Sequence, residues 1–397
     1  MPTESTFLLA GLFFLAAALG YFFARFSDDD TDEDPVPGAI SADYIKGLNF
    51  LLNEEPDQAL EVFMRMVQVD DETLETHFAL GSLFRRRGEV DRAIRVHQNI
   101  IARPRLSDMH REQALVALAE DYLSAGLLDR AEQLFSELRA SPTHRVLAAR
   151  KLVRIYEVTR DWQQAIDAYI ELEKLDPEAA KESRVAHYYC ELAEQALRAD
   201  NAAAARGFLK KADACQNTTV RASLLRADLH RLAGNHRRAI AGYREVLERE
   251  QRLIGEVVPK LAASARARND QSGFSRILQQ LRDADPSASK AIALAAVYDA
   301  DIVNPTVLEC LRDYVLADPV LTNLVDVSRL REESPQVQHA ALEEIRAGLR
   351  RVVSQAHRYR CKNCGYVTSE LLWQCPSCRA WETVSPAVQL SFPSFVS

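Results

Sequence analysis

Apolar side chains recur along most of the chain at helical spacing, in repeated segments of about 34 residues. Alanine on one helix lets a neighbouring backbone approach closely, and a large side chain four residues later fills the space between adjoining pairs. This pattern predicts a solenoid of antiparallel helix pairs across residues 40–320, with six clear repeats. The aligned alanines are Ala59, Ala93, Ala131, Ala165, Ala204 and Ala239, and the large residues are Phe63, His97, Phe135, Tyr169, Phe208 and Tyr243.

The repeat resembles the tetratricopeptide repeat, whose unit of about 34 residues is a pair of helices. Gly47 and Gly81 stand twelve residues before the first two alanines, where a first helix needs a small side chain. The pairs Gly273/Ile277 and Val307/Leu311 match the repeat pattern less well and extend the predicted repeats to about Pro319. His97 replaces the usual aromatic residue, so we expect it to be buried.

The N-terminal region, residues 1–25, contains the uncharged 18-residue stretch Phe7–Ala24. Such a stretch spans about 27 Å as a helix, close to the hydrocarbon thickness of a bilayer. It predicts a transmembrane anchor; a signal peptide and a buried core helix are the alternatives. A signal peptide would need basic residues before the apolar stretch, and residues 1–6 have none. Arg25 and Lys46 follow the stretch, which predicts a cytoplasmic location for the rest of the chain.

Residues 26–39 form an acidic linker. The run Asp28–Asp34 carries six of the acidic residues, against a net charge of −8 for the whole chain. Like charges and the prolines at 35 and 37 predict a solvated spacer. Without this run the chain is almost neutral, which argues against a nucleic-acid-binding protein.

Residues 321–356 are predicted to be connecting helices between the repeats and a C-terminal module. Ser334-Pro335 is typical of a helix start. One apolar face follows, which predicts a long helix that docks on the end of the solenoid. Its members are Val337, Ala341, Ile345, Leu349 and Val352.

Four of the seven cysteines lie in residues 357–385 with the spacing C-x2-C-x10-C-x2-C, followed by a tail at 386–397. Two such pairs can complete a tetrahedral set of four thiolates, which suits zinc or a single iron ion. The pattern predicts a small rubredoxin-like domain with one structural metal ion, and Gly365 provides the turn after the first pair. Rubredoxins usually place glycine after the second pair too, whereas this chain has Arg379, and we therefore prefer zinc to iron. The predicted ligands are Cys361, Cys364, Cys375 and Cys378.

Alternative uses of these cysteines are a redox pair and a zinc ribbon that binds nucleic acid. A redox pair needs a thioredoxin-like setting, which the surrounding Pro, Gly and aromatic residues do not indicate. The membrane anchor and the acidic chain argue against nucleic acid. Because no phosphate-binding loop, dinucleotide glycine motif or HExxH motif occurs, we expect a mainly α, non-enzymatic protein.

Solenoids bind partners mainly through the groove lined by their first helices. The repeat phase places five arginines where they can face this groove and present carboxylate-binding forks. The alternative is that each is an ordinary solvated surface residue. The five are Arg85, Arg86, Arg150, Arg154 and Arg231.

An anchor, a tetratricopeptide array and a terminal four-cysteine domain together resemble the lipopolysaccharide assembly protein B family of Gram-negative bacteria. The resemblance covers almost the whole chain, and the four cysteines match the family's metal ligands. The strongest stretches are Tyr44–Leu52, Leu80–His97, Asp121–Glu132 and Tyr359–Trp381.

The resemblance implies a single-pass inner-membrane adaptor without catalysis of its own. Such an adaptor presents the deacetylase LpxC to the membrane protease FtsH for degradation, and an inner-membrane signalling protein of the PbgA/LapC type relieves this action. Two alternatives stay open. One is a passive scaffold that assembles lipopolysaccharide synthesis and transport enzymes, and the other is an enzyme whose site is assembled only in the fold.

Overall fold

The computed structural model describes residues 45–47, 49–50, 55, 58–59, 61–62, 71–178, 184–215, 219–299, 301–324, 326–332, 334–353 and 357–391. The chain divides into an N-terminal body, Met1–Leu127, and a C-terminal body, Leu128–Ser397. The predicted span Phe7–Ala24 and the acidic linker 26–39 lie outside the described residues. Within the described part, no helix is both long and apolar enough to cross a membrane.

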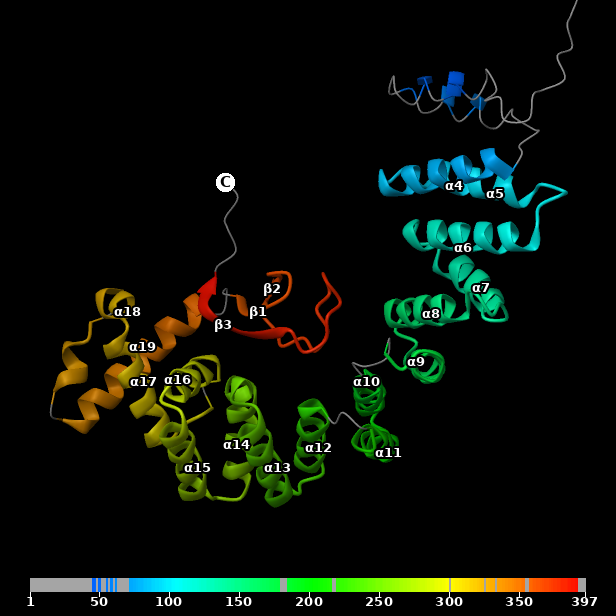
Figure 1. The fold of residues 1–397 in the computed structure, drawn as a ribbon. Coiled ribbons are helices and arrows are strands. Elements are labelled where there is room, and N and C mark those ends of the chain that lie inside the picture. The colour runs from blue at the N-terminus through cyan, green and yellow to red at the C-terminus, as the bar shows by residue number, and fades with distance from the viewer. Residues whose placement is uncertain are drawn as a thin grey trace, which may run out of the picture. The chain divides into compact units, whose positions relative to one another are not determined.

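Helices make up most of the described residues of both bodies, as the repeat pattern predicts (Figure 1). The N-terminal body contains α4 (Asp71–Arg86), α5 (Val90–Ile101) and α6 (Asp108–Ser124). The C-terminal body begins with α7 (Leu128–Leu138), α8 (Arg145–Thr159), α9 (Trp162–Leu175), α10 (Val185–Arg198), α11 (Ala202–Asp213), α12 (Val220–Leu232) and α13 (His236–Arg249). It continues with η1 (Gln251–Leu253), α14 (Ile254–Ala267), α15 (Gln271–Ala284), α16 (Ala288–Tyr298), α17 (Pro305–Ala317), α18 (Pro319–Leu324), η2 (Ser328–Arg331) and α19 (Pro335–Val353).

In six repeats of the described part of the chain, a residue with positive φ ends the first helix and turns the chain toward the second helix. Each of these residues stands five positions before a buried residue in the first part of the second helix. The backbone conformation therefore confirms the repeats independently of side-chain type. The φ values of the turn residues lie between 54° and 82°, at Gly88, Gly126, Arg160, Asp200, Gly234 and Asn269. The matching buried residues are Ala93, Ala131, Ala165, Ala205, Ala239 and Phe274.

The predicted repeat positions are wrong by one residue in two helices, α11 and α15. In α11 the buried residues are Ala205 and Leu209, not Ala204 and Phe208. The run of alanines at 202–205 contains several equivalent small residues, so residue size alone does not determine which of them is buried.

In α15 the buried residues are Phe274 and Leu278, not Gly273 and Ile277. Gly273 instead lies in the first turn of the helix, where its N–H donates to the capping carboxylate of Asp270 at 2.9 Å. The predicted positions Val307 and Leu311 are both fully buried in α17, as expected.

His97 is fully buried at the meeting point of α4, α5 and α6, as expected. A Cβ atom added to Gly81 would fall well inside van der Waals distance of the His97 ring, so this glycine makes room for the imidazole. The Nδ1 of His97 bonds the buried carboxylate of Asp121. Asp121 in turn accepts from Arg85 at 2.6 Å, and this ion pair joins α4 to α6.

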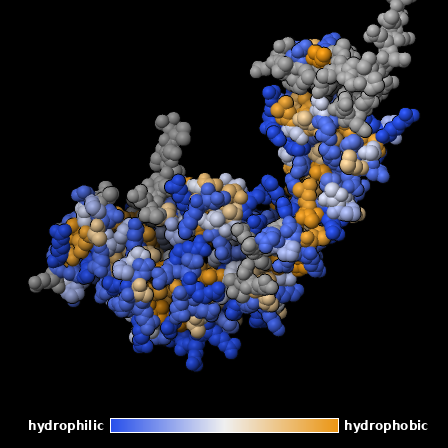
Figure 2. All heavy atoms as spheres, in the orientation of Figure 1, coloured by the Kyte–Doolittle hydropathy of each residue, from blue (hydrophilic) through white to orange (hydrophobic). Residues whose placement is uncertain are grey.

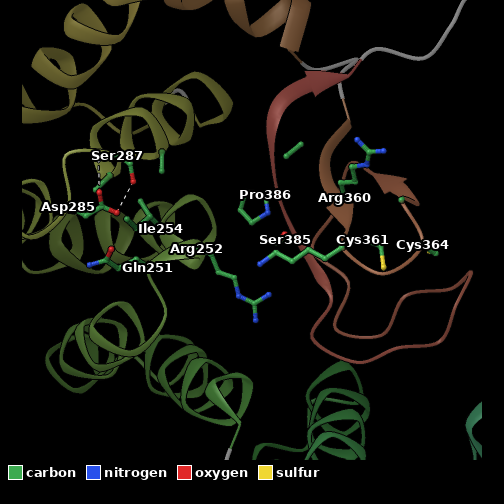
Figure 3. Close-up of a pocket in the computed structure, with 15 residues that line it drawn as sticks. Gln251, Arg252, Ile254, Asp285, Ser287, Arg360, Cys361, Cys364, Ser385 and Pro386 are labelled. Atoms are coloured by element: carbon green, nitrogen blue, oxygen red, sulfur yellow. Dashed lines mark hydrogen bonds between the residues drawn. The ribbon is translucent and has the colours of Figure 1, made fainter.

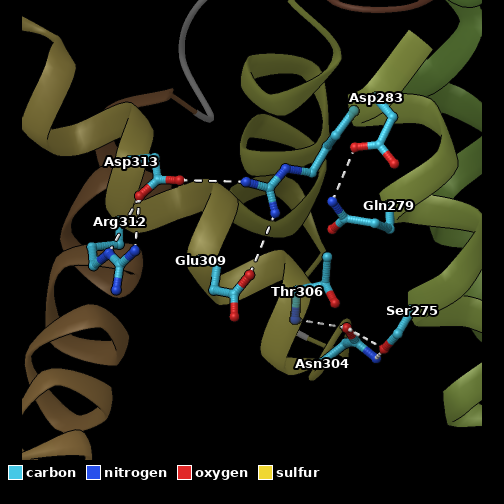
Figure 4. A network of polar contacts seen from close by, with 9 residues as sticks. Ser275, Gln279, Asp283, Asn304, Thr306, Glu309, Arg312 and Asp313 are labelled. Carbon is cyan, nitrogen blue, oxygen red and sulfur yellow. Dashed lines mark hydrogen bonds and ion pairs between the residues drawn. The ribbon is translucent and has the colours of Figure 1, made fainter. Parts of the chain in front are cut away.

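Polar side chains join α15 to α17 near the end of the solenoid (Figure 4). The buried Asn304 caps α17 by accepting from the Thr306 N–H at 3.0 Å, and its Nδ2 donates to Ser275 on α15 at 3.0 Å. On the same side Arg282 pairs with Glu309 at 3.4 Å. These contacts fix the two helices against each other where the repeat sequence is poorest.

Helix α19 packs on the last repeat, as its apolar face predicts. Ala341, Leu342 and Ile345 join the core cluster formed by α12 to α17. Arg346 is buried and donates to the Ile302 carbonyl at 3.1 Å. This arginine therefore serves a tertiary contact and is not simply a surface charge.

A three-stranded antiparallel sheet follows, with the order β2-β1-β3. Its strands are β1 (His357–Cys361), β2 (Val367–Thr368) and β3 (Val384–Ser391). Strand β3 therefore continues into residues that the sequence assigned to the tail. In the C-terminal body this sheet lies inside the curve formed by α10 to α19 (Figure 1), and hydrophilic side chains cover most of the visible face of the helices (Figure 2).

Candidate metal centre and its docking surface

The four predicted ligands, Cys361, Cys364, Cys375 and Cys378, lie together, with all four Sγ atoms within 4.8 Å of one another. The Sγ atoms of Cys361 and Cys378 are 3.7 Å apart, and those of Cys364 and Cys375 are 3.6 Å apart. Four sulfurs at about 2.3 Å from one metal ion have a tetrahedral edge of roughly 3.8 Å. The observed separations fit such an ion and are far too long for a disulfide bond, which measures about 2.0 Å.

The two cysteine loops have the same backbone design. In the first loop the Gly365 N–H donates to the Cys361 carbonyl at 3.0 Å, and in the second the Arg379 N–H donates to the Cys375 carbonyl at 2.8 Å. Gly365 has a φ of 80° and Arg379 a φ of 59°. Arg379 thus adopts the backbone conformation that glycine provides in the first loop. The sequence difference at Arg379 does not change the metal loop, so it provides no argument for zinc over iron.

The electrostatics of the cluster favour a thiolate at two of the four positions. Burial raises the pKa of the Cys361 thiol, but hydrogen bonds with the Thr383 hydroxyl and the backbone N–H groups of Cys364 and Asn363 lower it to about 6. Hydrogen bonding from the Ala380 N–H lowers the pKa of Cys378. A closed set of four thiolates leaves a metal ion no open coordination position, so such an ion is structural.

At Cys375 burial outweighs the hydrogen bonds from the backbone N–H groups of Cys378 and Ser377 and raises the thiol pKa to about 11. Metal binding must therefore displace a proton from this sulfur at neutral pH. Cys375 and Cys361 form a small core with Tyr359 and Val384. So few buried residues cannot stabilise a domain of this size alone, and metal binding supplies folding free energy.

Trp381, three residues after the last cysteine, inserts between helices α8, α9 and α10. Its ring stacks on His187 with the centroids 4.7 Å apart and meets Tyr188 and Trp162 edge-on at 5.9 and 6.2 Å. Its indole Nε1 donates to Glu157 at 3.1 Å. The metal domain is therefore docked on the repeats through an aromatic cluster with one buried acceptor.

A second docking contact joins the sheet to α14 and α16. The guanidinium of Arg358 lies 3.7 Å from the ring centroid of Tyr298, and the Tyr359 hydroxyl donates to Glu256. Arg252 donates to the carbonyls of Glu382 and Val384 at 3.1 and 3.2 Å. These contacts hold the sheet from a direction different from that of Trp381.

A third contact uses Arg221, of which only 2% is exposed. Its guanidinium lies 5.7 Å from the centre of the Trp373 ring and pairs with Glu191 at 2.8 Å and Glu194 at 2.7 Å. Burial lowers the pKa of Arg221, but these two carboxylates outweigh it and raise the pKa overall. Arg221 on α12 is therefore a buried charged residue that links α10 to the metal domain.

A cleft of about 1110 Å³, called the first cleft here, lies between the first cysteine loop and helices α14 to α16 (Figure 3). Arg360, Lys362 and Cys364 line one wall, and Arg252 and Asp285 belong to the helical side. The hydrogen bonds of Arg252 to the sheet cross the same interface. Arg252 therefore both lines the first cleft and takes part in docking the metal domain.

A further cleft of about 1020 Å³, called the second cleft here, lies between the second cysteine loop and helix α8. Ser377, Cys378 and Arg379 line its metal-domain wall. Arg150 and Arg154 line its helical wall. Two of the five predicted groove arginines therefore meet at one cleft, beside the metal domain.

The other three predicted arginines lie elsewhere. Arg85 and Arg86 belong to the N-terminal body, where Arg85 pairs with Glu120 and Asp121 and Arg86 is exposed. Arg231 is half-buried on α12 and hydrogen-bonds the Tyr243 hydroxyl. A partner-binding role for the five arginines stays a prediction.

Sequence reasoning missed Trp381, Glu157 and Arg379 as residues of this surface. In the sequence, Trp381 is one of several aromatic residues around the cysteines and carries no sign of a docking role. Nothing in the repeat pattern distinguished Glu157 from the other acidic residues of the helices. The only available signal was a large aromatic side chain in a domain too small to bury it, which requires a neighbour to pack against.

Comparison with known proteins matches both modules. Residues 359–386 match the family described as rubredoxin metal binding domain, and residues 76–108 match the tetratricopeptide repeat family. Among solved structures, a tetratricopeptide repeat protein from Parabacteroides merdae is 12% identical and MamA 17% identical. The first covers 69% of this chain and 99% of its own with a TM-score of 0.33; the second covers 44% and 94% with a TM-score of 0.28.

Curated relatives match nearly the whole chain. Lipopolysaccharide assembly protein B of Escherichia coli (strain K12) is 33% identical over 375 residues, which cover 94% of this chain and 96% of that protein. The protein of the same name from Haemophilus influenzae is 32% identical over 384 residues, with the same coverage. The chain belongs to the lipopolysaccharide assembly protein B family.

Proposed function

We propose that this protein is a non-enzymatic inner-membrane adaptor that regulates lipopolysaccharide biosynthesis by presenting LpxC to the protease FtsH. The observation that carries the proposal is the match to lipopolysaccharide assembly protein B over 94% of the chain. The architecture supports it, because a helical solenoid with a docked, closed metal domain offers binding surface and no open metal position.

The proposed membrane location rests on the sequence of Phe7–Ala24, which is long and apolar enough to span a bilayer. An anchor of this kind would hold the adaptor close to a membrane protease and raise their effective concentration. Arg25 and Lys46 favour a body on the cytoplasmic side. A signalling protein of the PbgA/LapC type is the proposed inhibitory partner.

Zinc is the proposed metal, since structural sites of four thiolates are a preferred zinc environment. The sulfur separations of 3.6 and 3.7 Å suit iron equally. Metal analysis and the visible absorption spectrum of freshly purified protein distinguish the two ions. A colourless protein with one equivalent of zinc supports the proposal, and a red protein with iron contradicts it.

A passive scaffold for lipopolysaccharide synthesis and transport enzymes is the second candidate, favoured by the word "assembly" in the name of the relatives. Affinity purification of the full chain from membranes separates the two. An adaptor brings down both FtsH and LpxC. Recovery of biosynthetic or transport enzymes without FtsH would contradict the adaptor and support the scaffold.

A further inference from the structure

We propose that the second cleft binds an extended acidic peptide segment of a partner protein. This inference rests on the proposed adaptor function and specifies where a client is held. The cleft lies between α8 and the second cysteine loop and measures about 1020 Å³. That volume is sufficient for several side chains of a bound peptide.

Positive charge dominates the cleft. It is lined by Arg150, Lys151 and Arg154 from α8, Arg184 at the start of α10 and Arg379 from the metal domain. Two acidic residues, Glu157 and Glu178, also line it. Glu157 accepts hydrogen bonds from the Tyr188 hydroxyl at 2.7 Å and the Trp381 indole at 3.1 Å, and it pairs with Arg184 at 3.9 Å. Because five basic residues face two acidic ones, the lining of the cleft is mainly cationic.

Two of these arginines have guanidinium groups available for a ligand. Within the described part of the chain, neither Arg154 nor Arg379 has an ion pair or side-chain hydrogen bond. Arg150 has one long pair with Asp176 at 3.4 Å, and its side chain is 56% exposed, so the pair contributes little. Guanidinium groups bind carboxylates through two parallel hydrogen bonds, which favours an acidic ligand.

The backbone at Arg379 supports a role for its side chain. Its φ of 59° costs a non-glycine residue about 1 kcal/mol, and Gly365 avoids this cost at the equivalent place in the first loop. The metal loop itself therefore does not require an arginine here. The side chain lines the cleft, where it adds a positive charge to the wall opposite α8.

The lining favours a peptide over a phosphate group. Apolar side chains also line the cleft: Leu147 is partly exposed, and Val153, Tyr169 and Leu172 are nearly buried. Leu147 therefore offers the main apolar contact for a residue of a bound peptide. A phosphate site concentrates donors around one point, often at backbone N–H groups. In the second cleft the basic residues come from three separate segments, and two carboxylates lie among them, which is unfavourable for a phosphate group.

The test is a selection of random dodecapeptides displayed on phage against the full-length, metal-loaded protein in detergent. Arg379→Gly is the counter-target, because it relaxes the backbone and keeps the metal loop. We expect selected peptides rich in Asp and Glu that bind the wild-type protein about tenfold more tightly than Arg379→Gly or Arg154→Glu, as one lost charged pair predicts. Arg237→Glu, an exposed position on α13 outside the cleft, is the matched control and keeps the affinity.

Three outcomes overturn the proposal. They are a selection without enrichment of acidic peptides, an equal affinity for Arg154→Glu and Arg237→Glu, and displacement of the peptide by inorganic pyrophosphate beyond the effect of sodium chloride at the same ionic strength. The last outcome assigns the cleft to a phosphate-bearing ligand. Since the readout is peptide binding, failure leaves the proposed effect on LpxC turnover to be judged separately.

Discussion

The indole Nε1 of Trp381 donates a hydrogen bond to Glu157 at 3.1 Å, although 224 residues separate the two in the chain. Glu157 is buried in α8, and Tyr188 donates to the same oxygen at 2.7 Å. Burial and the Glu157 charge raise the pKa of the Tyr188 hydroxyl, which stays a donor at all ordinary pH values. A buried carboxylate needs such donors. The metal domain thus completes the hydrogen bonding of an acid within the solenoid.

Trp381→Ala is expected to loosen the docking of the metal domain on α8 to α10 without loss of the metal. Removal of a packed tryptophan costs roughly 3 kcal/mol, and here it also leaves Glu157 with one donor fewer. Hydrogen exchange should become faster in β1, β3 and α10, while the metal content stays at one equivalent. Tyr366→Ala is the control, since this side chain is 39% exposed on the same domain. Equal protection from hydrogen exchange in the wild type and in Trp381→Ala would refute the docking role of Trp381.

Cys361→Ser is expected to lose the metal and loosen the sheet while the helices stay folded. Three remaining thiolates bind the ion far less well, and the domain depends on the metal for its folding. Metal analysis measures the loss of the metal, and hydrogen exchange in β1 to β3 measures the loosening of the sheet. Far-ultraviolet circular dichroism shows whether the helices stay folded. Cys215→Ser, a cysteine outside the cluster, should keep the metal. Full metal content in Cys361→Ser would show that the assignment is wrong.

Gly81→Ala is expected to destabilise the N-terminal body by about 1–3 kcal/mol, because its methyl group would overlap the buried His97 ring. The displaced imidazole would also disturb its bond to Asp121. Hydrogen exchange of α4 to α6 gives the measurement. Gly207→Ala is the matched control: among the described residues, nothing outside the adjoining backbone of its own helix lies within 4 Å of the added Cβ. The alanine should therefore stabilise α11 by about 1 kcal/mol. Similar effects of the two substitutions would contradict the packing described for His97.

The docked state should weaken at acidic pH through Glu382. The hydrogen bond from His187 lowers the pKa of this carboxyl below its ordinary value of 4.5, and partial burial opposes the shift. A lowered folded-state pKa stabilises the docked form above about pH 4.5, and this contribution decreases as the pH falls toward the folded pKa. The hydrogen-exchange protection of β3 should therefore fall more between about pH 5 and pH 3.5 in the wild type than in Glu382→Gln. Identical pH profiles at equal metal content would exclude this contribution.

Local patterns explain why much of the fold was predictable. The spacing of four cysteines within 18 residues determines which sulfurs can meet, because each pair is held by one short loop. Repeated small and large residues similarly reveal the helix pairs, whose partners are neighbours in sequence. The register errors at Ala204 and Gly273 occurred where residue size alone gave several choices or where a cap required the glycine.

Contacts between distant segments could not be predicted from these patterns. The site of Trp381 depends on the curvature of several repeats, which no single repeat encodes. The same curvature brings Arg379 opposite Arg154 at the second cleft. The positive φ of Arg379 was also hidden, because arginine rarely adopts this conformation and the residue therefore looked like a departure from the metal-loop pattern.

The half-life of LpxC in cells with and without this protein, at constant FtsH, tests the central claim most directly. Adaptor function predicts a longer half-life after depletion and its return to normal when the wild-type chain is restored. An unchanged half-life would contradict the adaptor function and favour a passive assembly scaffold.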